Sequence, residues 1–123
     1  MTRIDANVIL RYLLGDHPEY SPRAAEIIET SAVYAAREVL CEVVYVLSGV
    51  YAVDRNTIKE KLIELITLDT VDVDDTQILT VALQTYADRK IDFVDALLYA
   101  HKKVHGDSIV TFDQKLIKLM NAD

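Results

Sequence analysis

The chain has 123 residues, of which 51% are apolar and 27% are charged, with only three Gly, two Pro and one Cys. This length fits a single domain, and the composition excludes an intrinsically disordered chain and a Gly/Pro-rich low-complexity chain. The formal net charge is −7, whereas a nucleic-acid-binding domain is typically basic. The charge balance therefore argues against a protein that binds nucleic acid through its overall charge.

The sequence also indicates where the protein resides. No uncharged apolar run approaches the ~20 residues needed to span a bilayer, and Asp5 stands where a signal peptide would be apolar. The single cysteine, Cys41, cannot form an internal disulfide, which suits a reducing compartment. We therefore expect a cytoplasmic protein that has no membrane partner.

The first half of the chain alternates between short strand patterns and longer helical patterns. A short strand ends at Asp5, and apolar residues at helical spacing follow it to about residue 14. A second helix begins at Ser21-Pro22, where proline occupies the first helical position. The remaining predicted elements of this half are a strand at 32–35, an apolar helix from 37 to about 50, and a helix that begins at 54–57.

The second half continues this alternation. A strand pattern at 70–73 alternates polar and apolar side chains, and Asp75 or Thr76 can cap the helix that follows it. Strands that are separated by helices form parallel sheets. We therefore predict one α/β domain at 1–123, with a short parallel sheet of four to five strands flanked by helices. The remaining predicted elements are the helix to about residue 87, a helix from Asp92 to just before Gly106, a strand at 108–112, and a helix from Asp113.

Acidic residues stand at the junctions where several helices begin. Asp5 and Asp113 each stand at a strand-to-helix junction, and Asp92 and Asp95 lie at the start of another helix. Because strand C-termini and helix N-termini gather along one edge of a parallel sheet, these acids can converge in space. Helix capping is the simpler explanation for any one of them, since Asp is a favoured N-cap residue. Three such junctions in one small sheet favour a functional site.

Glu42 lies within a helix that is apolar nearly all round, which predicts burial. The alternative is that Glu42 and Glu38, one turn apart, form a thin exposed stripe. A buried acid that faces other acids needs a cation, and oxygen-only ligands select a hard ion such as Mg²⁺ or Mn²⁺. Clustered acids that hold such ions can hydrolyse phosphodiesters. Asn7 and Thr111, each two residues from an acid, could orient the carboxylates or bound water.

Four stretches of the sequence together resemble a PIN domain, and most closely the VapC-type toxins of VapBC toxin–antitoxin modules. The match covers essentially the whole chain, and the stretches occur in the right order. They are residues 4–13 (IDANVILRYL), Glu42 in its apolar helix followed by Val46-Leu47, residues 92–100 (DFVDALLYA), and residues 110–113 (VTFD).

The resemblance implies a PIN-like fold and an endoribonuclease that depends on Mg²⁺ or Mn²⁺. It also implies that this enzyme is the toxin of a type II module, with RNA as substrate, a cognate antitoxin as partner, and a homodimeric state. Its catalytic and metal-binding acids would be Asp5, Glu42, Asp95 and Asp113. Asp92, Asn7 and Thr111 are the additional candidates for this site.

Two alternative functions are compatible with the sequence. A PIN-fold nuclease could act in RNA processing or on structured DNA, and an inactive PIN-like domain could serve as an interaction module. Intact acids at all four positions argue against the inactive module, and the small size favours a toxin.

Part of the negative charge of the chain belongs to the candidate site acids themselves. Six cations flank these segments and could meet phosphates, namely Arg89, Lys90, Lys102, Lys103, Lys115 and Lys118.

Overall fold

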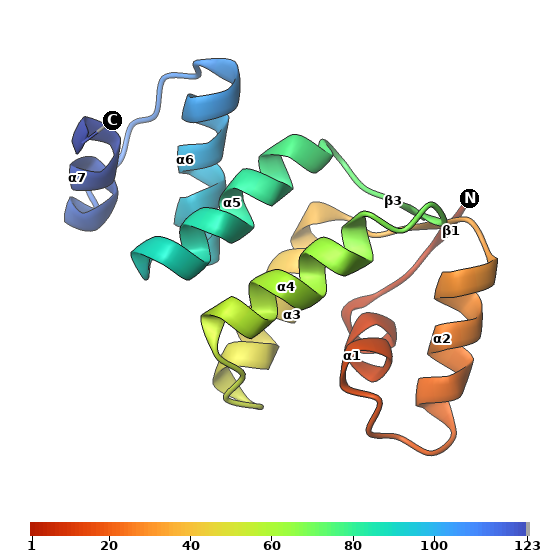
Figure 1. Cartoon of the computed structure of the whole chain (residues 1–123). Helices are drawn as coiled ribbons and strands as arrows, with labels where there is room; N and C mark the ends of the chain where they lie inside the picture. The colour runs from red at the N-terminus through yellow and green to blue at the C-terminus, as the bar shows by residue number, and fades with distance from the viewer. Residues whose placement is uncertain (123) are drawn as a thin grey trace. The chain divides into compact units, whose positions relative to one another are not determined.

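A computed structural model of the protein describes residues 1–122, so residue 123, the last of the predicted domain, lies outside the described residues. The described residues contain three short strands and seven helices (Figure 1). They form two compact units, whose described parts are Met1–Asp74 and residues 75–122. Each unit is described by itself.

The first unit is organised by a parallel sheet with the strand order β1-β2-β3. Strand β1 (Thr2–Arg3) pairs with β2 (Val33–Tyr34), and β2 pairs with β3 (Val71–Asp72). Parallel strands cannot be joined by a tight turn, so each connection in this sheet is a crossover made of two helices. The predicted α/β class and the parallel sheet are therefore confirmed.

Four helices of the first unit bury their apolar faces against one another. Helix α1 (Ala6–Leu14) packs against α2 (Tyr20–Thr30) and α3 (Arg37–Gly49), and α3 packs against α4 (Arg55–Ile66), as Figure 1 shows. The sequence sets the ends of α1, because Asp5 caps its start and Gly15 takes the left-handed conformation at its end, with φ of 59°. The fully buried side chains of the first unit include Ile9, Ile28, Val43, Leu47, Ile58 and Leu65.

The second unit is helical throughout the residues that the structure describes. Helix α5 (Thr76–Arg89) packs along α6 (Phe93–His105), and α7 (Gln114–Ala122) contacts α6. Tyr86 and Phe93 meet edge to face, with 6.0 Å between the centroids of their rings. Leu116 of α7 is fully buried. The unit therefore has an apolar core of its own.

The strand predicted at 108–112 is wrong, and so is the predicted count of four to five strands. These residues are irregular, and Val110 and Phe112 are 87% and 92% exposed. A strand is stable only when another strand completes its hydrogen bonds. The described part of the second unit contains no such strand, so this apolar segment lacks a partner there.

Candidate functional site

Asp5 sits where β1 passes into α1, and its side chain also has a structural role. One carboxylate oxygen, Oδ1, accepts a hydrogen bond from the backbone N–H of Val8 at 3.0 Å. Asp5 and Asn7 are both exposed, so each keeps polar atoms that face solvent. Asp5 is therefore a helix cap that remains accessible to a ligand.

Glu42 is exposed, and the prediction of a buried carboxylate is wrong. It lies on the outward face of α3 with Glu38, and Tyr45 on the same helix is 79% exposed. Although its sequence is apolar nearly all round, helix α3 buries only one face, which carries Leu40, Val43, Val44 and Leu47. Among residues 1–122, the Glu42 side chain makes neither a hydrogen bond nor an ion pair. Its carboxylate is thus available to a cation.

The second unit carries three of the predicted acids near the starts of its last two helices. Asp113 caps α7, since its Oδ1 accepts a hydrogen bond from the N–H of Leu116 at 2.9 Å. The N–H of Asp113 donates to the hydroxyl oxygen of Thr111 at 3.0 Å, which fixes the turn that leads into the helix. Asp92 occupies the N-cap position of α6, but its side chain makes no capping bond. Capping therefore accounts for Asp113 and leaves Asp92 without a structural role.

Asp95 lies in the first turn of α6 and is half-buried. Burial raises the pKa of its carboxyl group, and the negative charges of Asp113 and Asp92 raise that pKa further. The charges of Asp92 and Asp113 therefore act on the Asp95 carboxyl group, and a cation bound near it would relieve this repulsion. Oxygen donors of this kind fit a hard divalent ion such as Mg²⁺ or Mn²⁺.

The predicted acids are divided between the two units. Asp5 and Glu42 belong to the first unit, whereas Asp92, Asp95 and Asp113 belong to the second. Within the described residues, neither unit alone brings three His, Cys, Asp or Glu side chains close enough to hold a metal ion. The convergence of all four predicted ligands at one site stays a prediction.

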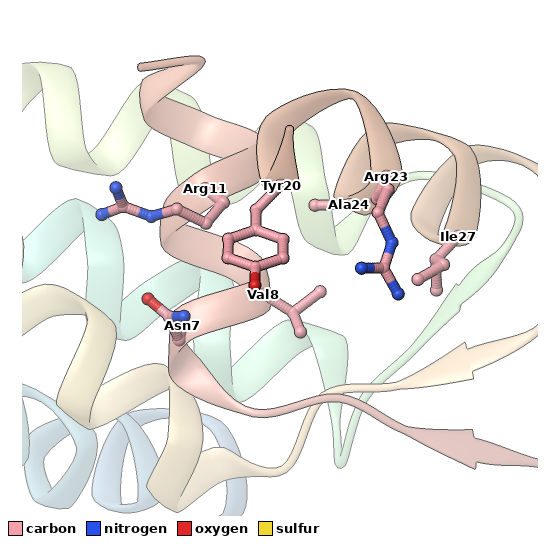
Figure 2. A pocket seen from close by; sticks show the side chains of 7 residues that line it. All are labelled: Asn7, Val8, Arg11, Tyr20, Arg23, Ala24 and Ile27. Atoms are coloured by element: carbon pink, nitrogen blue, oxygen red, sulfur yellow. The ribbon is translucent and has the colours of Figure 1, made fainter. Parts of the chain in front are cut away.

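A hollow of about 200 Å³ opens between α1 and α2, beside the start of α1 (Figure 2). The Tyr20 side chain reaches across it from α2, between the side chains of Arg11 and Arg23 in this view. Arg11 donates hydrogen bonds to Asp16 at 2.9 Å and to the Tyr51 hydroxyl at 2.8 Å. Neither arginine was among the candidate site residues that the sequence suggested. The lining residues are Asn7, Val8, Arg11, Tyr20, Arg23, Ala24 and Ile27.

The PIN domain family matches residues 3–121, which is nearly the whole chain and includes most of both units. The chain therefore belongs to the PIN domain family, whose members are generally nucleases and typically use divalent metals. No curated protein matches the chain. No solved structure matches it either. Among residues 1–122, no helix combines the length and the apolar character needed to cross a membrane.

Proposed function

We propose that this PIN domain is a Mg²⁺-dependent endoribonuclease, with Mn²⁺ as a substitute ion, and that it is the toxin of a type II toxin–antitoxin module. The observation that carries the proposal is the set of acids at the starts of α6 and α7. The side chains of Asp92 and Asp95 make no hydrogen bond or ion pair among residues 1–122, and burial and then the neighbouring carboxylates raise the pKa of Asp95. Repulsion between neighbouring carboxylates gives the fold no stability and a bound divalent cation would offset it, so these acids support a metal site.

The residues proposed to hold the ion are Asp5, Glu42, Asp95 and Asp113, with Asp92 as an additional candidate. When bound, a divalent ion of this kind supplies Lewis-acid assistance to phosphodiester hydrolysis. The protein residues set the geometry around it. The Thr111 hydroxyl fixes the turn before Asp113, and the α1 cap fixes Asp5. The carboxylates of Asp5 and Asp113 are therefore oriented before a ligand binds, which reduces the entropy lost on binding.

Two protein partners belong to this proposal, a second copy of the chain and an antitoxin. The exposed aromatic and apolar side chains at the end of α3 support the homodimer, since Tyr45, Val50 and Tyr51 are 79%, 71% and 40% exposed. Aromatic residues are enriched in protein interfaces. The hollow between α1 and α2 supports the antitoxin, because it combines an apolar floor with arginine and tyrosine side chains (Figure 2). A partner that covers this hollow would also cover the approach to Asp5.

The test of the activity is an end-labelled substrate assay with single-stranded RNA, an RNA hairpin and a DNA flap of related sequence. We expect internal cleavage of RNA that requires Mg²⁺ or Mn²⁺ and stops in EDTA. Preferential cleavage of the DNA flap would instead support a nuclease that acts on structured DNA. If none of the substrates is cut at any metal concentration, the enzyme proposal fails.

The toxin proposal has its own test, because a nuclease need not be a toxin. Expression of the chain in a bacterial host should arrest growth, and co-expression with the gene adjacent to it should restore growth and yield a stable complex. Growth that continues during expression of an active nuclease would remove the toxin assignment and leave the nuclease assignment intact.

A further inference from the structure

Two adjoining hollows on the second unit share the side chains of Arg89 and Leu119. The larger hollow, of about 370 Å³, has Lys115 and Lys118 of α7 on its rim together with Arg89. Its apolar floor consists of Ile91, Leu119 and Ala122. The smaller hollow, of about 210 Å³, contains Lys103 and Tyr99 of α6. We call the two hollows together the basic groove.

Three of the four cations of the basic groove make no ion pair with an acid of the described residues. Among residues 1–122, Arg89, Lys115 and Lys118 make no ion pair and no side-chain hydrogen bond. Lys103 lies with its ammonium nitrogen 3.4 Å from the hydroxyl oxygen of Tyr99 and 5.7 Å from the centre of that ring. Asp88, which lines the smaller hollow, is the single acid that residues 1–122 contribute to the lining of the two hollows. The groove therefore presents positive charge that is available to an anion.

The distribution of charge along the chain agrees with this local picture. The first unit has seven Lys and Arg against 13 Asp and Glu, whereas the second has six Lys and Arg against seven Asp. Three of those seven are Asp92, Asp95 and Asp113, the candidate metal ligands of this unit. Without them the second unit carries a net positive charge. The acidic balance of the whole chain thus hides a locally basic surface.

The groove also lies on the segments that carry those acids. Arg89 precedes Asp92 by three residues, and Lys115 follows Asp113 by two. Lys115 and Lys118 are three residues apart on α7 and so project from the same side of the helix. A polyanion that follows the groove therefore reaches the neighbourhood of the acids without leaving the unit.

We propose that the basic groove binds the phosphodiester backbone of single-stranded RNA and directs one phosphate to the acids, an inference that rests on the proposed ribonuclease function. Each phosphate that pairs with a lysine or arginine releases counterions and so favours binding. The apolar floor offers a surface for sugar or base faces between the phosphates. An acidic peptide could pair with the cations of the groove but would make no favourable contact with the neighbouring carboxylates. A nuclease substrate needs both, because its reacting phosphate is the one that a metal must hold.

The first experiment measures RNA affinity without cleavage. A fluorescein-labelled single-stranded RNA is titrated with protein in EDTA, at several salt concentrations, and Kd is followed by anisotropy. Loss of one phosphate contact lowers the slope of log Kd against log salt by about 0.7 for single strands. The double variant Lys115→Gln/Lys118→Gln should therefore lower the slope by about 1.4 and weaken binding at low salt. Lys59→Gln, on α4 of the first unit, is the matched control and should leave the slope unchanged.

A second variant separates charge from folding. Lys115→Arg/Lys118→Arg keeps both charges and should retain the wild-type slope, while melting curves show whether each variant is folded. A Gln variant that is folded and binds RNA with the wild-type affinity and slope would overturn the inference. So would an equal loss in the Lys59→Gln control, or a polyglutamate peptide that binds the wild type more tightly than RNA does.

A cleavage assay distinguishes this inference from the proposed function on which it rests. Removal of binding contacts made equally in the ground state and transition state raises KM and leaves kcat unchanged. We expect this pattern for Lys118→Gln. A wild type that binds RNA through the groove but never cleaves it refutes the ribonuclease and leaves the groove supported. A wild type that cleaves RNA, with KM and kcat unaltered in Lys118→Gln and in the double variant, refutes the groove and leaves the ribonuclease supported.

Discussion

Substitutions of Asp5 separate its helix-capping role from its proposed catalytic role. Its Oδ1 accepts the hydrogen bond of the Val8 N–H at 3.0 Å and so satisfies a donor that α1 cannot satisfy. Replacement of such a cap by alanine costs about 1 kcal/mol. For a chain of this length that loss lowers the melting temperature by about 4 °C. Asp5→Asn keeps an acceptor oxygen at the cap and should change stability by less than about 0.5 kcal/mol.

Cleavage should respond differently from stability. Asparagine is neutral and binds a divalent ion more weakly than a carboxylate, so both Asp5→Asn and Asp5→Ala should lose RNA cleavage. Asp54 offers a matched control, because it caps α4 by accepting a hydrogen bond from the Thr57 N–H at 3.2 Å and is not among the predicted ligands. Asp54→Ala should lose comparable stability and keep cleavage.

The assay for this prediction combines thermal melting in EDTA with cleavage of labelled RNA in Mg²⁺, both far below the melting temperature of every variant. Wild-type cleavage by Asp5→Asn would show that Asp5 is a helix cap and nothing more. Loss of cleavage in folded Asp54→Ala would show that cleavage depends on helix capping alone. It would then refute the argument that loss of cleavage in the Asp5 variants reflects a metal ligand.

Three further predictions follow from individual contacts. The pKa of Asp95 is raised above its ordinary value of 3.8, so its ionisation destabilises the metal-free fold as pH rises from about 3.8 through the raised value. Asp95→Asn should therefore raise the melting temperature in EDTA at pH 7, and an unchanged or lower melting temperature would contradict this. Tyr45→Glu should convert the proposed dimer to a monomer in light scattering at micromolar concentration, whereas a wild type that is already monomeric there would disprove the dimer. Thr111→Val removes the acceptor for the Asp113 N–H and should cost about 1 kcal/mol in a melting curve and reduce cleavage; wild-type cleavage would remove Thr111 from the site.

The helices of this fold were predictable because their signals are local. The helix expected from Asp92 to just before Gly106 is α6, Phe93–His105, and the helix expected from Asp113 is α7. A cap, a periodic apolar face and a terminating glycine all act within a few residues of one another. The strand expected at 108–112 required a partner strand that the segment itself does not specify. An apolar run predicts that a segment prefers burial, but it cannot name the strand that will pair with it.

The candidate site shows the same division between local and distant information. Asp5 and Asp113 were expected at helix starts, and both cap helices, whereas their role in a metal site stays a prediction. Glu42 was expected to be buried, but burial depends on how many elements surround α3, which the composition of one helix does not determine. The union of the four acids in one site, and the single domain at 1–123, stay predictions because each depends on contacts between distant parts of the chain.

The central proposal is that Asp5, Glu42, Asp95 and Asp113 hold the metal ion of a ribonuclease. The most direct measurement is the rate of RNA cleavage as a function of Mg²⁺ concentration for the wild type, Asp5→Asn and Asp95→Asn, with Asp54→Asn as the control. We expect saturable, EDTA-sensitive cleavage in the wild type and the control. We also expect loss of cleavage in both site variants. Wild-type cleavage by either site variant, or cleavage by the wild type that persists in EDTA, would contradict it.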